Sequence, residues 1–500
     1  MTLRAEHDSL WGYLQGALTP KQLSRPLLAN FNHWAFVQQT VAEIALTLNQ
    51  MGSQVEIAFW GGNTPIHDTA YSTSNKIASL LLSPSREQRI VSGLKACGIP
   101  NSAFTRPPIR KWNPQEQLRF PDVLNRSSIR AMKYRGADIG RAILQVHPDL
   151  ETPITDRHLW PDKWVKTAAR SFAYVFDQTT ELIIKNEVTS VFVYNGRFLH
   201  DRAVAEAAQQ LGIATVNYDT GGADTDFDLT VDPTHDWSRL QERMMLLYDG
   251  WNPSERDEIG SGWFAQRANH ADQQNQAYTD AQQIGLTIEV PSDKKIVVYF
   301  SSSGDEIVEL DLDWNEYFGD QDGALRELGA ACQGQDDLFL VVRTHPHKRR
   351  KPRLDVAQWH ESVKAVNPDV HLDEHSEIDS YALMRQADVV VTYGSTTGIE
   401  AAFSGRPVIV MGPSAYDELD AVQRVKNSAQ LRAALAKPST RSKKGAIAFG
   451  LMMQRRGFNY SATSPNGRFE LHGRNLEDSN QLVLHASHFM SKISRSRLLR

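Results

Sequence analysis

Residues 388–410, DVVVTYGSTTGIEAAFSGRPVIV, constrain the fold more than any other stretch of this chain. The β-branched run 389–391 predicts a strand, residues 399–403 predict a helix, and the apolar run 408–411 predicts a second strand. A strand, a tight glycine-containing turn, a helix and another strand in this order form a βαβ unit. Such a unit belongs to a parallel sheet, so the chain is predicted to be an α/β protein.

The turn between the first strand and the helix is a candidate phosphate-binding site. Ligands of open parallel sheets bind beyond the carboxyl ends of the strands, and a helix that begins there presents free N–H groups to an anion. Glycines allow close approach of the backbone, and hydroxyl groups add donors. The residues concerned are Gly394, Ser395, Thr396, Thr397, Gly398 and Glu400, the last within reach of a sugar hydroxyl. Alternatively, the hydroxyl groups only cap the helix and Glu400 only favours its N-terminus.

Length and composition predict a globular protein of more than one domain. A chain of 500 residues is too long for one ordinary hydrophobic core, so we expect two domains. Its 41% of hydrophobic and 23% of charged residues are ordinary for a globular chain. A formal net charge of −5 does not favour nucleic acid as a partner.

The pattern of apolar runs predicts four segments. They are an N-terminal Rossmann-like domain over 1–230, a helical connector over 231–290, a C-terminal Rossmann-like domain over 291–445, and a helical tail over 446–500. The resemblance described below implies that this tail packs back toward the N-terminal domain. The connector is rich in Asp, Gln and Asn, with helices predicted over 237–250 and 265–284. Residues 100–165 are predicted to form long loops and irregular helices, and their role stays open.

Polar residues follow two predicted strands of the N-terminal domain. Asn195 and Arg197 follow the strand 190–194, and Asp219 ends the strand that begins at 213. Both positions are at carboxyl ends of strands, where a ligand cleft is expected.

Three loops of the C-terminal domain follow three apolar strands. They are the loop of Ser301, Ser302, Ser303, Asp305 and Glu306, the loop of Arg343, His345, His347 and Lys348, and the turn 394–398. Loops of this kind converge on one crevice in a twisted parallel sheet, and their hydroxyl and cationic groups suit a phosphate or diphosphate ester. As an isolated charge run, the segment 343–353 also fits a plain solvated basic loop.

Several motifs are absent from the sequence. It has no GxxxxGK[ST] phosphate loop, no GxGxxG after the first strand, no GxSxG elbow and no HExxH. The DxD triplets at 224–226 and 311–313 could hold Mg²⁺ or Mn²⁺, but neither directly follows a clear buried strand. We therefore expect no metal site and no cofactor.

Cysteine usage and hydropathy predict a cytoplasmic protein. Cys97 and Cys332 form no CxxC pair, which predicts neither a disulfide framework nor a zinc site. The N-terminus lacks the pattern of a signal peptide, and no apolar stretch is long enough to span a membrane. The basic end, 492–500, is predicted to be a solvated terminus, with a weak peripheral contact at the inner face of the inner membrane as the alternative.

A set of motifs resembles bacterial capsule polysaccharide biosynthesis glycosyltransferases. It comprises FSSSGDE, the pair Asp320-Gln321, VVRTHPH and ADVVVTYGSTTGIEAAFSGRPVI, with YNGRF and DTGG in the first domain. These enzymes have the GT-B architecture, in which the parallel sheets of two Rossmann-like domains face across a cleft. They are distantly similar to Kdo transferases of capsule assembly. The pairing of His-Pro with a Ser/Thr-rich turn is similar to that of bacterial sialyl- and Kdo-transferases, which use CMP-sugars.

The resemblance implies roles for individual residues. His345 would contact the donor phosphate, the hydroxyl groups of 395–397 would help to hold it, and Glu400 would meet the donor ribose. The family often places its catalytic base in an Asp/Glu-Asp/Glu-Gly motif, whose nearest counterpart here is Asp219, although Thr220 stands where the second acid is expected. Asp305 or Glu306 is the alternative acid, and Asp219 could instead be a turn residue that bonds its own backbone.

Together these observations predict a metal-independent glycosyltransferase of bacterial surface polysaccharide synthesis. Its donor would be a nucleotide-sugar, CMP-Kdo or a similar CMP-sugar, and its acceptor a glycan or glycolipid. Domain closure would exclude water from the reaction. The predicted catalytic residues are Asp219, His345 and Glu306; the donor residues are Ser301, Ser302, Ser303, Arg343, His345, Gly394, Ser395, Thr396, Thr397 and Glu400; and the acceptor residues are Asn195 and Arg197. The alternatives are a nucleotide-sugar epimerase, a polyol-phosphate transferase, or a non-catalytic nucleotide- or sugar-binding protein of polysaccharide assembly.

Overall fold

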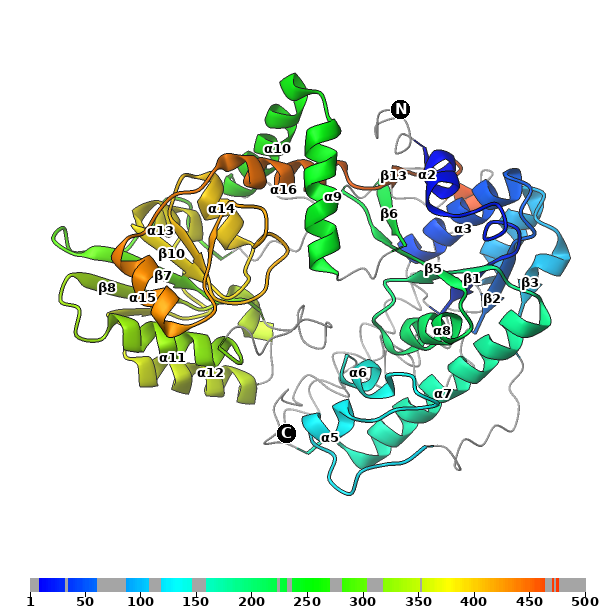
Figure 1. Cartoon of the computed structure of the whole chain (residues 1–500), viewed down its shortest axis with the longest axis horizontal. Coiled ribbons are helices and arrows are strands. Elements are labelled where there is room, and N and C mark those ends of the chain that lie inside the picture. The colour runs from blue at the N-terminus through cyan, green and yellow to red at the C-terminus, as the bar shows by residue number, and fades with distance from the viewer. Residues whose placement is uncertain are drawn as a thin grey trace. The chain divides into compact units, whose positions relative to one another are not determined.

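The computed structural model divides the chain into two compact units. The first comprises residues 1–234 and 456–500, and the second comprises residues 235–455. The residues that the structure describes are 9–31, 35–60, 87–107, 118–145, 159–222, 225–231, 236–269, 281–303, 318–350, 353–463, 470–471 and 474–475. Each unit is built on one sheet with helices on both faces (Figure 1).

The second unit contains a fully parallel six-stranded sheet. Its strands, in spatial order, are β12 (Gln423–Arg424), β11 (Val408–Val410), β10 (Val389–Thr392), β7 (Lys295–Phe300), β8 (Leu338–Arg343) and β9 (Val370–Leu372). Numbered along the chain from β7, this is the 3-2-1-4-5-6 order of a doubly wound Rossmann sheet.

The first unit has the same winding with an added antiparallel edge. Its strands, in spatial order, are β13 (Phe458–Asn459), β6 (Asp226–Thr230), β5 (Ala214–Thr220), β4 (Ser190–Tyr194), β1 (Pro26–Asn30), β2 (Glu56–Phe59) and β3 (Phe104–Thr105). The strands from β3 to β5 are parallel, whereas β6 and β13 are each antiparallel to the strand before them in this order. The predicted α/β class with two Rossmann-like domains is confirmed.

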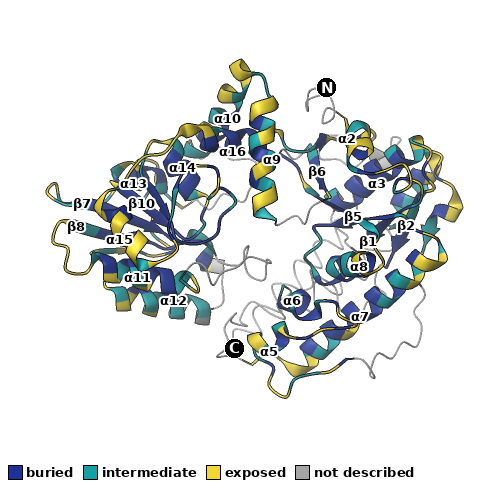
Figure 2. Cartoon of the chain, in the orientation of Figure 1, coloured by how far each residue is buried: buried dark blue, intermediate teal, exposed yellow. Residues whose placement is uncertain are grey.

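Helices bury both faces of each sheet, and their exposed faces point outward (Figure 2). In the first unit, α5 (Arg126–Arg130), α6 (Ile139–Leu144), α7 (Asp162–Lys185) and α8 (Leu199–Gln210) cover one face, and α2 (Leu10–Ala17) and α3 (Ala35–Gln50) the other. In the second, α11 (Gln321–Cys332), α12 (Arg353–Val366) and α15 (Ser428–Ala436) lie opposite α10 (Pro253–Ala268), α13 (Ser380–Gln386), α14 (Thr397–Phe403) and α16 (Lys443–Arg455).

Short polar residues begin several of these helices. Asp320 accepts a hydrogen bond from Gly323 N–H at the start of α11, and Asp379 accepts one from Tyr381 N–H at the start of α13. These carboxylates satisfy N–H groups that have no partner inside the helix and interact favourably with its dipole.

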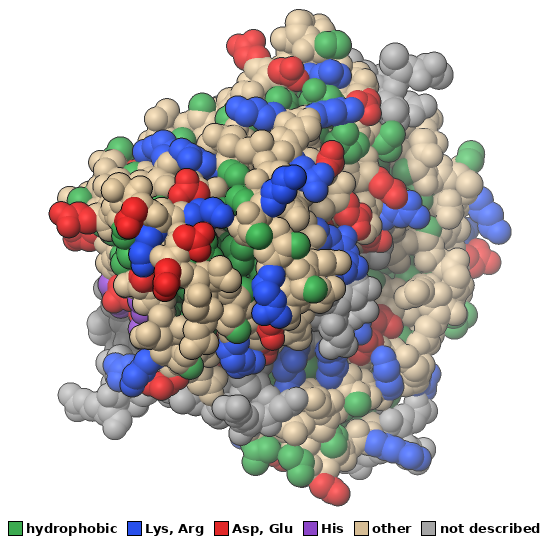
Figure 3. Space-filling model, turned by 60° about the vertical axis from the view of Figure 1, so that its left-hand side comes forward, with side chains coloured by type: hydrophobic (Ala, Val, Ile, Leu, Met, Phe, Trp, Pro, Cys, Tyr) green, Lys and Arg blue, Asp and Glu red, His purple; other side chains and the backbone are tan. Residues whose placement is uncertain are grey.

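On the face turned forward in Figure 3, Lys and Arg side chains lie interspersed with Asp and Glu side chains.

One helical region of the predicted connector begins earlier than expected. The helix expected over 265–284 lies partly outside the described residues, since 270–280 are not described, and its described N-terminal part belongs to α10, which begins earlier, at Pro253, and ends at Ala268. Pro253 is well placed at the first turn, where its missing N–H costs no hydrogen bond. Both α10 and α9 (Trp237–Gly250), whose bounds the sequence predicted, belong to the second unit.

The chain returns to the first unit after α16. β13 adds to the sheet beside β6, and the Glu43 carboxylate on α3 accepts hydrogen bonds from the main-chain N–H groups of Ser461, Ala462 and Thr463. Glu43 is only 2% exposed. Convergent N–H donors offset the cost of burying a carboxylate, so this contact anchors the returning segment.

Candidate functional site

The switch point of the second sheet lies between its first and fourth strands, β7 and β10. In open α/β sheets, the loops that follow such strands form the ligand crevice. Here those loops contain Ser301–Ser303 and the turn 394–396, and the neighbouring strand β8 contributes Thr344 and His345. The fold therefore brings the described parts of the three predicted loops to one edge of one sheet. Asp305 and Glu306 lie outside the described residues.

His345 is held at the end of β8 by two hydrogen bonds. Its main-chain N–H donates to Ser301 Oγ at 2.8 Å, and its ring Nδ1 accepts the N–H of His347 at 3.1 Å. Because Nδ1 acts as an acceptor, a neutral ring carries its proton on Nε2. His345 can therefore present an Nε2–H donor, which is the form that binds a phosphate oxygen.

Gln321 fixes the loop after β7. The Gln321 Oε1 atom accepts both the N–H of Ser302, at 2.6 Å, and its hydroxyl, at 3.0 Å. Ser301 and Ser302 are buried, at 1% and 8% exposed, and Ser303 is more accessible. Ser301 and Ser302 thus hold His345 and the loop backbone in place, and Ser303 is the most accessible hydroxyl of the three.

Arg343 lies beneath the site and not on its surface. Its side chain is 2% exposed, and its two terminal nitrogens donate to the carbonyls of Asp373, at 2.7 Å, and Ser376, at 3.1 Å. Burial lowers the pKa of its guanidinium to about 10. These contacts use Arg343 to hold the loop after β9, so the predicted phosphate contact does not fit its position.

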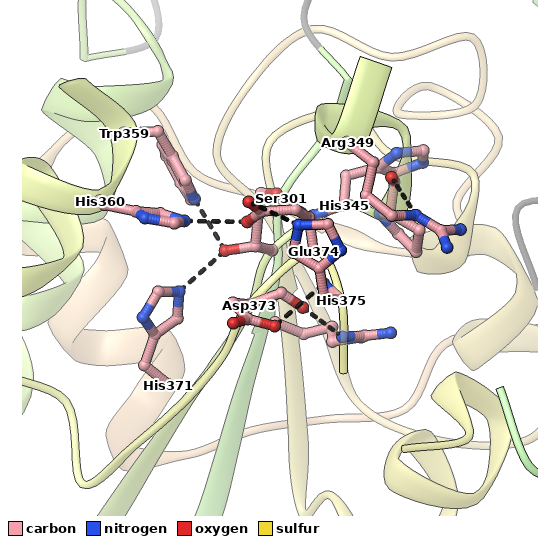
Figure 4. A network of polar contacts seen from close by, with 12 residues as sticks. Ser301, His345, Arg349, Trp359, His360, His371, Asp373, Glu374 and His375 are labelled. Carbon is pink, nitrogen blue, oxygen red and sulfur yellow. Dashed lines mark hydrogen bonds and ion pairs between the residues drawn. The ribbon is translucent and has the colours of Figure 1, made fainter. Parts of the chain in front are cut away.

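Further side chains form a hydrogen-bonded network next to His345 (Figure 4). Trp359 Nε1 donates to Thr344 Oγ1 at 2.8 Å, and Thr344 Oγ1 lies 2.9 Å from His371 Nε2. Burial lowers the pKa of His371, which favours the neutral ring and lets the Thr344 hydroxyl donate to it. Lys348 lies over the Trp359 ring, 4.9 Å from its centroid. The network locks the backbone on both sides of His345.

Glu374 joins two histidines beside this network (Figure 4). Its carboxylate is buried, and one oxygen lies 2.8 Å from His360 Nε2 while the other lies 3.6 Å from His375 Nε2. Among the described residues, however, no group of three or more His, Cys, Asp or Glu side chains is arranged to hold a metal ion.

The glycines of the turn after β10 are required by packing. Gly394 has a φ of +80°, and a Cβ there would lie 2.4 Å from the carbonyl oxygen of Pro413. A Cβ on Gly398 would lie 2.4 Å from the Tyr416 hydroxyl, which donates to Ser395 O. The close approach that these glycines allow is therefore to the neighbouring loop after β11.

The hydroxyl groups of the turn have different surroundings. Ser395 is 7% exposed, its N–H donates to Thr392 Oγ1 at 3.1 Å, and its hydroxyl donates to Thr397 Oγ1 at 3.2 Å. Thr396 is exposed and makes no capping hydrogen bond at the start of α14. A helix-capping role therefore does not explain the hydroxyl group of Thr396, whereas the hydroxyl group of Ser395 mainly stabilises the turn.

Glu400 makes an ion pair inside the second unit. Arg267 Nε on α10 donates to its Oε1 at 2.6 Å, and the Arg267 guanidinium lies 4.8 Å from the Trp263 ring centroid. Burial raises the pKa of Tyr381, as do the charge of Glu400 and the hydrogen bond that the tyrosine makes to it. Glu400 is 7% exposed, so Arg267 and Tyr381 fix its orientation.

A second polar cluster lies in the first unit, at the ends of β4 and β5. Asn195 has a φ of +58°, and its side-chain amide donates to Asp219 Oδ2 at 2.5 Å. The N–H of Thr220 donates to Asp219 Oδ1 at 2.8 Å. Left-handed backbone is uncommon outside glycine, and asparagine tolerates it best. The left-handed turn after β4 therefore positions the predicted acceptor residue Asn195 to hydrogen-bond the predicted base, Asp219.

Burial raises the pKa of Asp219 above its ordinary value. The Thr220 N–H, the charge of Arg456, the Asn195 amide and the charge of Arg197 each act in the opposite direction. A raised pKa makes the carboxylate a stronger proton acceptor. Arg197 itself lies over the Phe198 ring, 5.0 Å from its centroid.

Sequence reasoning missed several residues of these two clusters. Gln321 was visible within the Asp320-Gln321 pair, but its contact with Ser302 was not. Trp359 and His371 come from α12 and β9, which the sequence did not predict as elements. Arg456 is distant in sequence from Asp219, and only the fold brings it near.

Residues 258–444 match the model of the family described as "Capsule polysaccharide biosynthesis protein". Among curated proteins, Protein FixF from Sinorhizobium fredii is 34% identical over 109 residues, which are 22% of this chain and 24% of that relative. The matched region thus spans about a quarter of the relative's length. The described chain contains no helix that is both long and apolar enough to cross a bilayer.

Solved structures with some likeness include two enzymes of sugar metabolism. One is a β-Kdo 2,4-transferase, KpsC from Thermosulfurimonas dismutans, at 15% identity and a TM-score of 0.36, covering 54% of this chain and 84% of that one. Another is the UDP-GlcNAc 2-epimerase of Neisseria meningitidis, at 10% identity and a TM-score of 0.24, covering 87% of this chain and 95% of that one.

Proposed function

Residues 258–444 of this chain match the model of the capsule polysaccharide biosynthesis protein family, and on that premise we propose that the protein is a glycosyltransferase of bacterial polysaccharide synthesis. The proposal takes the GT-B form, in which the second unit binds a nucleotide-sugar and the first binds a glycan or glycolipid acceptor. A CMP-sugar such as CMP-Kdo is the donor that the sequence motifs favour.

The observation that carries the proposal is the geometry of His345. It lies at the carboxyl end of β8, next to the switch point of a doubly wound sheet, and its Nδ1 is occupied by the His347 N–H. An Nε2–H donor on this ring suits the phosphate oxygen of a departing nucleotide. A positioned donor of this kind stabilises charge that develops in the transition state. Ser303, Thr396 and Thr397 are the residues of these loops that carry a hydroxyl group and are at least partly exposed.

Asp219 is proposed as the base of an inverting transfer. The acceptor hydroxyl oxygen attacks the anomeric carbon, its proton passes to the Asp219 carboxylate, and the bond to the donor phosphate breaks with both electrons leaving on the nucleotide. The raised pKa of Asp219 supports this role, since a base is most effective when its pKa approaches the working pH. Asn195 orients the carboxylate, and Asn195 and Arg197 contribute to acceptor binding. No step of this scheme requires a metal ion.

Turnover tests the proposal. Nucleotide release from CMP-Kdo and from UDP-, GDP- and CDP-sugars is measured with and without capsular glycan acceptors, for wild type, Asp219→Asn and Asp228→Asn. Asp228 lies opposite Asp219 on β6 and is the matched control. We expect Asp219→Asn to lower kcat by roughly 100-fold or more, the usual effect of losing a general base, and Asp228→Asn to change it little. Undiminished transfer by Asp219→Asn would overturn the assigned base, and an epimer formed without acceptor would point to the epimerase alternative.

A further inference from the structure

Arg456, the first residue after α16, is fixed against the end of β5. Its main-chain carbonyl accepts the N–H of Gly222 at 2.8 Å, and its side-chain Nε donates to the carbonyl of Gly221 at 3.3 Å. Gly457 follows with a φ of +97°, and a Cβ there would lie 2.4 Å from Phe227 O, so the backbone at this point is tightly constrained. Both ends of Arg456 are thus tied to the turn that follows Asp219.

The groups that face Asp219 come from three different segments. From the loop after β4 come the Asn195 amide and the charge of Arg197, and from the returning segment comes the charge of Arg456. Asp228 is its register partner on β6, and Asp228 Oδ1 accepts the N–H of Leu229. The positive charges of Arg456 and Arg197 both act on Asp219, with Arg456 having the larger effect, and Asp228 is its partner across the sheet.

We propose that Arg456 is a positioning residue for Asp219: it braces the Gly221 turn and keeps a positive charge beside the carboxylate, so that Asp219 stays ionised and ready to take the acceptor's proton. The inference rests on the proposed function for the role of Asp219, but not for the pairing itself.

The physical need for such a residue follows from burial. Removing water disfavours the ionised form of a carboxylate, and a base that is already protonated cannot act. A nearby cation opposes this effect without taking the proton-accepting oxygens out of use. Arg456 meets that requirement because its Nε is bonded to Gly221 and not to Asp219.

A double-mutant cycle tests the pairing without any substrate. The Tm of the full chain is measured between pH 4 and pH 8 for wild type, Asp219→Asn, Arg456→Gln, the double variant and Arg456→Lys. Glutamine still offers a donor to Gly221 O but has no charge, and lysine keeps the charge. At pH 8 we expect Arg456→Gln to lower the Tm by about 2 °C or more when Asp219 is present, and by less in the Asp219→Asn background. The difference between these two effects is the coupling of the two residues. This coupling should decrease at lower pH, as Asp219 becomes protonated. Arg456→Lys, which keeps the charge, should retain most of this coupling.

A coupling that does not change with pH, or a lysine variant that behaves like the glutamine variant, would overturn the proposal and leave Arg456 a brace for the turn only. In the transfer assay, the acidic limb of kcat/KM should move to higher pH in Arg456→Gln. A coupling without pH dependence would contradict the positioning role of Arg456. Undiminished transfer by Asp219→Asn would contradict the role of Asp219 as the base, so the two failures are distinguishable.

Discussion

Gly394 and Gly405 have nearly the same left-handed backbone but different surroundings. Their φ angles are +80° and +81°, and a Cβ at Gly394 would meet Pro413 O at 2.4 Å whereas a Cβ at Gly405 would meet nothing within 4 Å. We expect Gly405→Ala to cost about 1–2 kcal/mol from backbone strain, and Gly394→Ala about 3 kcal/mol or more because the loop after β11 must also move. Chemical denaturation measures both. Equal costs would mean that the Pro413 contact yields without penalty.

Asp219 is expected to trade stability for reactivity. Its folded-state pKa is raised, so the folded protein binds this proton more tightly than the unfolded chain, and ionising Asp219 lowers stability as the pH rises through that folded pKa. Asparagine does not ionise. The Tm of Asp219→Asn minus the Tm of wild type should therefore increase between pH 4 and pH 8. A difference that moves the other way would mean that the carboxylate is stabilised in the fold.

At the scale of elements, the returning segment depends on one buried carboxylate. Glu43 on α3 accepts main-chain hydrogen bonds from Ser461, Ala462 and Thr463, and without it these N–H groups lose their partner. We expect Glu43→Ala to lower the free energy of unfolding by about 2–4 kcal/mol and to increase cleavage after β13 in limited proteolysis. Glu258→Ala, at an exposed position of α10, is the control, with an expected change within about 0.5 kcal/mol. Equal effects of the two variants would contradict this account.

The predictability of each element follows from its burial. β4 and β8 have the predicted bounds because runs of apolar residues between polar ends specify buried parallel strands. β9, with three residues, and β6, which is largely polar in sequence, lack such a run, and the sequence did not reveal them. The amphipathic α12 was hidden in a charge-rich segment.

The candidate site was predictable where it follows strand ends and not where it depends on tertiary contacts. The positions of Ser301, His345 and Ser395 at one sheet edge follow from the βα pattern. The inward role of Arg343 does not, because an arginine at the end of a strand has the same sequence signature whether it faces a ligand or two buried carbonyls. The same holds for Glu400, whose partner Arg267 comes from a distant helix.

At the scale of the whole molecule, the two units differ in continuity. Residues 235–455 form the second unit without interruption, whereas the first needs residues from both ends of the chain. We expect a fragment of residues 236–455 to unfold cooperatively. Its Tm should still increase when a nucleotide binds. A fragment of residues 1–234 lacks β13 and the partners of Glu43, and should be markedly less stable than one to which 456–463 is restored. Equal melting of the two first-unit fragments would contradict the anchoring role of this segment.

The central claim is that the second unit binds a nucleotide through His345, and thermal shift with CMP, CDP, UMP, UDP, GDP and CMP-Kdo tests it most directly. Wild type, His345→Ala and His347→Ala are compared with and without Mg²⁺; His347→Ala is the matched control because it keeps the N–H that His345 Nδ1 accepts. A ligand at 100 times its Kd stabilises the folded state by about 2.7 kcal/mol. The account predicts a metal-independent shift for one nucleotide class, greatly reduced in His345→Ala and retained in His347→Ala. No shift for any nucleotide with folded wild-type protein, or an undiminished shift in His345→Ala, would contradict it.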